Sequence, residues 1–133
     1  MLADDELGSS REDVRTPPNA HYVTAFDAIS SDKNQLLLVA EQAGAVVGFL
    51  QISIIPGLAR LGTTRGQIEG VRIARSARGS GLGSQMVLRA IEECRQRGCG
   101  LVQLTTDKTR PDAHRFYEAL GFTASHEGMK LAL

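Results

Sequence analysis

A glycine-rich loop between a predicted strand and a predicted helix constrains the fold of this chain more than any other feature. An alternating segment over residues 68–73 leads into the loop, which reads Arg78-Gly79-Ser80-Gly81-Leu82-Gly83-Ser84. Apolar side chains then recur with the period of a helix, at Met86, Val87, Ala90, Ile91 and Cys94. The first N–H groups of such a helix have no internal partners, and glycine lets the backbone approach a phosphate closely. The segment therefore predicts an anion site at the helix N-terminus.

The spacing of the glycines separates three classes of phosphate ligand. A P-loop ends in Gly-Lys-Ser/Thr, but Gly83 is followed by Ser84 and Gln85. A dinucleotide fingerprint would place its third glycine at Ser84, and no acidic ribose partner is evident about twenty residues later. The pyrophosphate of coenzyme A is the third class. A loop that only turns the chain is the alternative to all three.

The composition is that of one soluble globular domain, which we place over residues 1–133. Apolar residues make up 42% of the chain, and its 15 basic residues are balanced by 15 acidic ones. This balance gives no support to a nucleic acid or a membrane surface as a partner. The longest apolar stretches, such as residues 36–40, are too short to cross a bilayer, and an acidic segment at residues 4–6 argues against a secretory signal. We therefore expect a cytoplasmic protein.

Cysteine and histidine give no separate chemical signal. Cys94 and Cys99 lie five residues apart without a second pair, so we expect two reduced thiols. Cys94 belongs to the apolar stripe, which favours packing over nucleophilic chemistry. The three histidines, His21, His114 and His126, lack the close spacing of metal ligands, and we predict no metal site from them.

The remaining pattern predicts alternating helices and strands. A short amphipathic helix is expected over residues 20–30 with Asn19 as its N-cap, after a weakly ordered segment over residues 1–20. Gly70 inside its strand suggests a bulge or a close approach of the backbone, and Gly98 and Gly121 mark helix ends. The predicted strands are residues 36–41, 46–54, 68–73 and 101–105, residues 62–66 form a loop, the last helix is residues 111–120, and Phe122 with residues 129–132 supplies further strand.

Two motifs resemble those of the GNAT (Gcn5-related N-acetyltransferase) superfamily. The first is Arg78-Gly79-Ser80-Gly81-Leu82-Gly83, which matches the signature Arg/Gln-x-x-Gly-x-Gly/Ala. The second is the helix that ends in Phe116-Tyr117-Glu118-Ala119-Leu120-Gly121-Phe122. Their order and separation fit the family, and the resemblance covers roughly residues 36–133. It implies an α/β (α+β) fold with a mixed, mostly antiparallel sheet and an acyl-CoA site at the glycine loop.

The resemblance also implies how acetyl-CoA would bind. The bulged strand would bind the cofactor with Val71, Arg72 and Ile73, and the backbone groups of Val71 and Ile73 would pair with the pantetheine arm. The pyrophosphate would be wrapped by Arg78, Gly79, Ser80, Gly81, Leu82, Gly83 and Ser84. We expect the N–H of Val71, released from the ladder by a bulge at Gly70, to donate to the oxyanion of the tetrahedral intermediate.

Tyr117 and Glu69 are the candidate catalytic residues. The hydroxyl of Tyr117, with a reference pKa of about 10, can protonate a departing thiolate and remain neutral at pH 7. An aromatic side chain that only packs on the sheet is the alternative. Glu69 would take a proton from the acceptor amine, directly or through water, or would attract a cationic amine. A solvated charge on the strand is the alternative for Glu69.

The segment 105–117, with Ser125-His126 after it, is similar to a subgroup that contains aminoalkylphosphonate N-acetyltransferases. Arg110 could pair with an acidic group of the acceptor, but a charge at the helix entry is the slightly favoured interpretation. Relatives of that type respond to divalent metal, so a bound metal ion stays an open alternative for this chain. The family usually opens with a strand and a full helix, so we expect that strand to be absent here and residues 1–8 to be the end of the helix.

The predicted activity is acetyl transfer from acetyl-CoA to a primary amine of a small molecule, by direct attack in a ternary complex. Two alternatives remain, a noncatalytic acyl-CoA-binding or regulatory module and a protein N-acetyltransferase. A homodimer is a family-level expectation.

Overall fold

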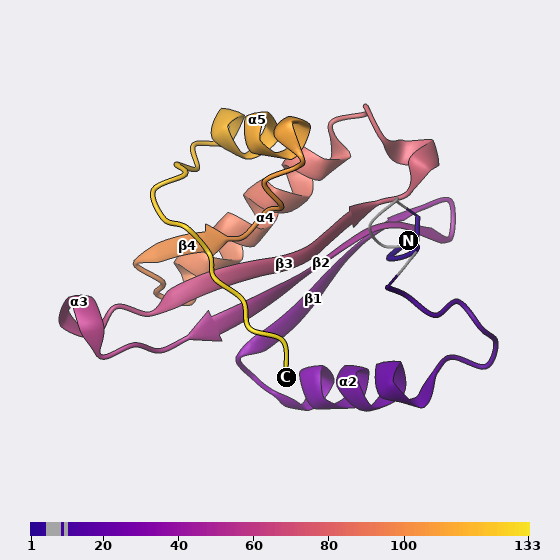
Figure 1. The fold of residues 1–133 in the computed structure, drawn as a ribbon, viewed down its shortest axis with the longest axis horizontal. Helices are drawn as coiled ribbons and strands as arrows, with labels where there is room; N and C mark the ends of the chain where they lie inside the picture. The colour runs from indigo at the N-terminus through magenta and orange to yellow at the C-terminus, as the bar shows by residue number, and fades with distance from the viewer. Residues whose placement is uncertain (5–8, 10) are drawn as a thin grey trace.

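The computed structural model describes residues 1–4, 9 and 11–133 and contains a mixed four-stranded sheet. Three consecutive strands pair antiparallel, and the fourth lies parallel to the third, in the order β1-β2-β3-β4 (Figure 1). The strands are β1 (Gln35–Gln42), β2 (Ala45–Ile55), β3 (Arg65–Ile73) and β4 (Leu101–Leu104). This arrangement confirms the predicted mixed, mostly antiparallel sheet.

The helices begin and end where their capping residues predict. The Asn19 side chain accepts a hydrogen bond from the N–H of His21 at 3.0 Å, as expected of an N-cap. Positive φ angles at Gly98 and Gly121 follow the ends of two helices. The helices are α2 (Ala20–Ser31), the single turn α3 (Ala59–Gly62), the 3-10 turn η1 (Arg75–Ala77), α4 (Leu82–Gln96) and α5 (Pro111–Ala119).

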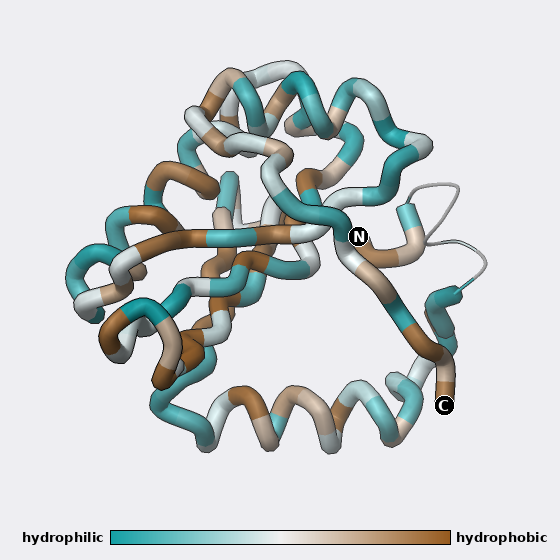
Figure 2. The backbone as a smooth tube through the Cα atoms, turned by 60° about the vertical axis from the view of Figure 1, so that its left-hand side comes forward, coloured by the Kyte–Doolittle hydropathy of each residue, from teal (hydrophilic) through white to brown (hydrophobic). Residues whose placement is uncertain are grey.

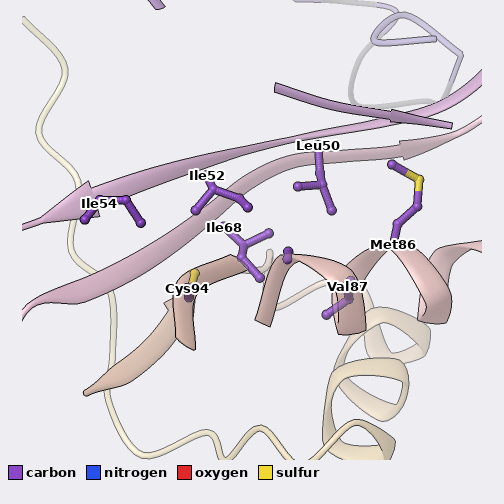
Figure 3. Packing of buried hydrophobic residues seen from close by; sticks show 8 residues of the cluster. Leu50, Ile52, Ile54, Ile68, Met86, Val87 and Cys94 are labelled. Carbon is purple, nitrogen blue, oxygen red and sulfur yellow. The ribbon is translucent and has the colours of Figure 1, made fainter. Parts of the chain in front are cut away.

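The core lies between α4 and one face of the sheet (Figure 3). Alternation along the strands directs Leu50, Ile52 and Ile68 toward this helix, and all three are buried. From α4 they meet the side chains of the predicted apolar stripe, Met86, Val87, Ala90 and Cys94, also buried. Burial of this stripe stabilises the contact between α4 and the sheet, and it fixes the glycine loop at the N-terminal end of that helix.

The opposite face of the sheet carries polar side chains beside apolar ones such as Leu37 and Phe49. The amide of Gln51 on β2 donates to that of Gln35 on β1 at 2.9 Å. A second amide pair joins Gln103 on β4 to Gln67 on β3 at 2.8 Å. The two faces therefore have different chemistry, with the apolar core on the α4 side and hydrogen-bonding groups on the other.

Two predictions about the fold are wrong. The loop predicted over residues 62–66 ends earlier, because β3 already begins at Arg65 and Gly66 pairs with both Ile54 and Val102. The strand predicted at Phe122 and residues 129–132 does not form, since no neighbouring strand offers those residues backbone partners and Met129 is almost fully exposed. The helix predicted over residues 20–30 is confirmed as α2, the helix at the bottom of Figure 2, and it buries none of its residues.

The predictions for the N-terminus are only partly open to comparison. Residues 11–18 contain neither helix nor strand, and the weak order predicted over residues 1–20 stays a prediction. Residues 5–8, which hold most of the helix end predicted over residues 1–8, lie outside the described residues. In the part of the chain that the structure describes, no strand precedes β1.

Alanine at Gly66 is expected to destabilise the protein by about 1–3 kcal/mol, because it adds a methyl group to a full core. A Cβ at this position would lie 2.3 Å from the Sγ of Cys94, which is completely buried. Urea denaturation measures the change, with Gly128→Ala as the control, because a Cβ there meets nothing closer than 3.7 Å. If the Cys94→Ala background does not relieve part of the loss, the clash is not its cause.

Candidate functional site

The strands β3 and β4 separate halfway along β3. Their pairing runs from Arg65 and Leu101 to Ile68 and Leu104 and ends there. Residues 69–73 of β3 continue without a partner on the β4 side, so one edge of this strand is open. We call residues 69–73 the open edge.

A bulge lies at the start of the open edge. Gln51 pairs with Glu69 and Phe49 with Arg72, so β3 uses one more residue than β2 between the same two pairs. Gly70 takes up the extra residue with a φ of 62°, a region that favours glycine. The predicted bulge is confirmed. It places the side chains of Glu69 and Arg72 on one face of the sheet, although an uninterrupted strand would place them on opposite faces.

The backbone groups of Val71 and Ile73 point out of the open edge. The N–H of Ala74 donates to the carbonyl of Val47 on β2 at 2.7 Å, so by alternation the groups of Ile73 and Val71 point away from β2. Two arginine side chains bind the carbonyls exposed in this way. Nη1 of Arg72 donates to the Val71 carbonyl at 3.0 Å, and Nε of Arg78 donates to the Ile73 carbonyl at 3.1 Å.

The glycine loop presents free amides at the start of α4. Gly79 and Gly81 have φ angles of 78° and 83°, and a Cβ on either would meet no atom within 4 Å. The N–H of Gln85 donates to the carbonyl of Gly81, which makes it the first N–H of α4 with a helical partner. The N–H of Leu82 donates to the hydroxyl of Ser80 at 3.4 Å, and those of Gly83 and Ser84 have no helical partner and can bind an anion.

Arginine side chains beside the loop hold a carboxylate of the N-terminal segment. Nη2 of Arg78 lies 3.3 Å from Oδ2 of Asp4, and Nη2 of Arg75 lies 3.7 Å from Oδ1 of the same residue. All three side chains are well exposed, and ion pairs of this kind contribute little to stability. A phosphate at the loop can therefore take the place of Asp4 at Arg78.

Tyr117 lies in α5 and packs against the core. Its ring makes edge-to-face contacts with Phe116 and Phe122, with ring centroids 5.0 Å and 5.9 Å away. Burial raises the pKa of the Tyr117 hydroxyl, and the positive charges of Arg110 and Arg72 oppose part of that rise. The hydroxyl is therefore protonated at neutral pH, the state that a general acid needs.

Glu69 is exposed and lies on the other side of β3 from Tyr117. Its side chain lies on the same face of the sheet as Gln51, whereas Tyr117 belongs to the cluster on the α4 side. Among the described residues Glu69 has no ion pair. The structure therefore does not join the two candidate catalytic residues directly. It places them on opposite sides of the open edge, an arrangement in which each could act on a different part of a bound thioester.

A pocket of about 330 Å³ lies beside the bulge, and sequence reasoning missed it. Its wall includes Phe49, whose ring covers Gly70 closely enough that a Cβ there would lie 3.3 Å from Cζ. The Tyr22 hydroxyl donates to the carboxylate of Glu12 within this pocket. No pattern in the N-terminal segment signals the pocket, because its residues are spread over two segments and two elements. The lining residues are Met1, Leu2, Ala3, Glu12, Asp13, Val14, Tyr22 and Phe49.

The other polar candidates have simpler surroundings. Burial raises the pKa of the Cys94 thiol to about 11, which keeps it protonated and unsuited to nucleophilic attack. Cys94 and Cys99 form no disulfide. Arg110 lies at the N-cap position of α5. Over residues 1–4, 9 and 11–133, no three His, Cys, Asp or Glu side chains are grouped to hold a metal, and no helix has the length and apolar character needed to cross a membrane.

A strand with an open edge, followed by a glycine loop with free amides, defines a site for a long ligand that carries phosphates. The family model for the acetyltransferase (GNAT) family matches residues 4–122. The chain therefore belongs to the GNAT family of acetyltransferases, which use acetyl-CoA as the acyl donor. The family resemblance inferred from the two motifs is confirmed.

Curated relatives and a solved structure are similar to the chain over most of its length. It is 37% identical to a glucosamine 6-phosphate N-acetyltransferase of Trypanosoma brucei brucei, over 70% of this chain and 61% of that protein. It is 36% identical to an aminoalkylphosphonate N-acetyltransferase of Salmonella typhimurium, over 76% of this chain and 65% of that protein. The alignments thus span less than two thirds of these relatives. The crystal structure of a transcriptional regulator from Bacillus halodurans C-125 superposes with a TM-score of 0.97 at 54% identity, covering 100% of this chain and 89% of that one.

Proposed function

We propose that this protein transfers the acetyl group of acetyl-CoA to a primary amine of a small molecule, by direct attack in a ternary complex. The observation that carries the proposal is the open edge of β3, which exposes the backbone of Val71 and Ile73 and leads through η1 to the free amides of α4. A pantetheine arm offers amides that can pair with such an edge. A diphosphate offers the anion that a helix N-terminus binds.

The cofactor would exchange contacts with arginine side chains as it binds. In the free protein, the Arg78 side chain donates a hydrogen bond to the Ile73 carbonyl and forms an ion pair with Asp4. Since a phosphate is a stronger partner for a guanidinium than an exposed carboxylate held at 3.3 Å, Arg78 is expected to turn to the diphosphate. That movement frees the Ile73 carbonyl for the pantetheine arm. Gly79 to Ser84 then bind the phosphate oxygens through their backbone amides.

The pocket beside the bulge suits the acceptor. Glu12 lines it and Glu69 is exposed on the same side of the sheet, so two carboxylates lie where a cationic amine would arrive, whereas Asp13 is already paired with Arg15. Its apolar walls would bury the body of a small molecule. The two curated relatives act, by their names, on amines of small molecules, glucosamine 6-phosphate and aminoalkylphosphonates. A small-molecule amine is therefore the substrate class that the pocket and the relatives both favour.

The transfer needs a base, an oxyanion donor and an acid. Glu69 takes the proton of the ammonium, directly or through water, and the free amine nitrogen bonds to the thioester carbon. The carbonyl electrons move to oxygen, where the N–H of Val71 donates. When they return, the C–S bond breaks with its electron pair on sulfur, and the Tyr117 hydroxyl gives its proton to the thiolate. The nitrogen, which still carries one proton more than the amide needs, loses it through water to the tyrosinate, and Glu69 returns its own proton to solvent. The products are the acetylated amine and free coenzyme A.

An assay of thiol release with acetyl-CoA and a panel of small primary amines tests this function. The wild-type protein should release thiol with at least one amine. The Glu69→Gln variant should lose roughly tenfold or more in kcat/KM for that amine, because general base catalysis contributes about 10²–10⁴. Glu41→Gln is the matched control, since Glu41 is an exposed carboxylate at the far end of β1. Equal losses in both variants, or none in either, would remove Glu69 from the reaction.

A noncatalytic acyl-CoA-binding regulator is the second candidate, favoured by the similarity to the Bacillus halodurans protein, which is named a transcriptional regulator. Such a module would bind coenzyme A and release no thiol with any amine. The same assay, combined with calorimetric titration of acetyl-CoA, therefore separates the two functions. A protein N-acetyltransferase would instead acetylate peptides and ignore the amine panel. Homodimerisation stays a prediction, which sedimentation can test.

A further inference from the structure

Arg72 contains a buried hydrogen-bond donor without a partner. Its Nε is fully covered, and within the described part of the chain it is the only buried side-chain nitrogen or oxygen that lacks a hydrogen bond. Guanidinium is always charged in proteins, and a buried charged donor without an acceptor is costly. Native structures rarely keep such a group unless it has a role that the free protein does not show.

The guanidinium lies at the open edge. Arg72 belongs to the face of Glu69, but its Nη1 turns to the carbonyl of Val71, whose backbone groups point out of that edge. Its positive charge also acts on the Tyr117 hydroxyl from the other side of β3. Arg72 therefore shares the face of the candidate base and contacts the residue that carries the candidate oxyanion donor.

A purely structural role does not account for the arrangement. Capping the Val71 carbonyl uses Nη1 and leaves Nε without an acceptor. Arg72 has no ion pair within 4 Å with any carboxylate in the described residues, although Glu69 shares its face of the sheet. The charge is thus left uncompensated at the place where the reaction creates a negative charge.

We propose that Arg72 is a catalytic residue, whose guanidinium donates to the oxygen of the tetrahedral intermediate together with the N–H of Val71. This inference rests on the proposed function, since it needs a thioester at the open edge. As the amine nitrogen bonds to the carbonyl carbon, the carbonyl electron pair moves to oxygen. The guanidinium leaves the Val71 carbonyl to the pantetheine arm and turns toward this oxyanion, which uncovers Nε and gives it an acceptor. The pair returns to carbon when the C–S bond breaks, so Arg72 gains and loses no proton. A charged donor is roughly twice as strong as a neutral amide for this purpose.

Steady-state kinetics of Arg72→Gln tests the inference with the amine that gives thiol release in the wild-type protein. We expect kcat to fall by roughly 10²-fold, because one oxyanion donor is typically worth 10²–10³ in kcat. The Kd for coenzyme A should change by less than about threefold. Arg95→Gln is the matched control, since this arginine is exposed at the far end of α4 and pairs only with Glu92. Arg72→Lys keeps the positive charge but lacks the planar set of guanidinium donors, so it should retain part of kcat. It serves as the test variant if Arg72→Gln does not fold.

Chemical rescue separates catalysis from structure. Guanidinium added at millimolar concentration to Arg72→Ala should restore part of kcat, whereas a protein damaged only in its fold would gain nothing. An unchanged kcat in Arg72→Gln, or a loss confined to the KM of the acceptor, would overturn the inference while leaving the proposed function intact. Wild-type protein that binds coenzyme A but releases no thiol would refute both.

Discussion

Phenylalanine at position 117 is expected to lower kcat by roughly a hundredfold, the usual contribution of a general acid. The change removes one oxygen atom and keeps the edge-to-face contacts with Phe116 and Phe122, so the fold should be preserved. The affinity for coenzyme A should change little, because the hydroxyl is assigned to the departing thiolate and not to the bound cofactor. Steady-state kinetics measures kcat, and calorimetric titration measures the Kd for coenzyme A.

The pH dependence of the wild-type activity is an independent check on the role of Tyr117. Because burial raises the pKa of Tyr117 above its usual value, the hydroxyl stays protonated in the folded protein beyond the pH at which an exposed tyrosine ionises. In the wild-type protein, ionisation of Tyr117 should therefore cost activity and stability only as the pH rises above about 10. If Tyr117→Phe turned over at the wild-type rate at pH 7–8, this tyrosine would have no part in the reaction.

Valine at Gly81 is expected to raise the Kd for coenzyme A by about 10- to 100-fold. Gly81 has a φ of 83° and precedes the first residue of α4, so a β-branched residue must either adopt a strained backbone or turn the loop amides away from the ligand. The strain alone costs about 1–2 kcal/mol, and each lost amide contact adds to it. Titration calorimetry with coenzyme A measures the change.

Gly44→Val is the matched control for this strain. Gly44 lies in the hairpin between β1 and β2 with a φ of 77°, and like Gly81 it has no atom within 4 Å of a Cβ position. The substitution should lower the stability by a similar amount and leave the Kd for coenzyme A unchanged. Equal affinities of the two variants would mean that the glycine loop does not hold the cofactor.

The fold was predictable where local chemistry decides the structure. Asn19 caps α2, Gly70 forms the bulge, and the stripe from Met86 to Cys94 is the buried side of α4, each as its residue type or spacing indicates. Prediction failed where a distant partner decides. Gly66 joins β3 because Ile54 and Val102 pair with it, and the apolar residues at 129–132 remain irregular because no strand lies beside them.

The candidate site also contains some features that local sequence predicts and others that depend on distant parts of the chain. The glycine loop could be read from its spacing, and the resemblance pointed to the backbone of Val71 and Ile73, whose exposure then follows from the end of the β3–β4 pairing. The pocket beside Phe49 could not be predicted, since it depends on how the N-terminal segment meets the sheet. The buried, unpaired Nε of Arg72 is likewise a tertiary property. Sequence patterns find the groups that act through the backbone more readily than those that act through a folded environment.

The proposed function depends on the binding of coenzyme A by the glycine loop over residues 78–84. An amide-resolved NMR titration of the full chain with coenzyme A should shift the backbone signals of residues 78–84 most, with Val71 and Ile73 next. Saturable binding with those shifts is the result that we predict. Absence of binding at millimolar coenzyme A, or binding that leaves residues 78–84 unperturbed, would contradict the assignment of the glycine loop and of the reaction built upon it.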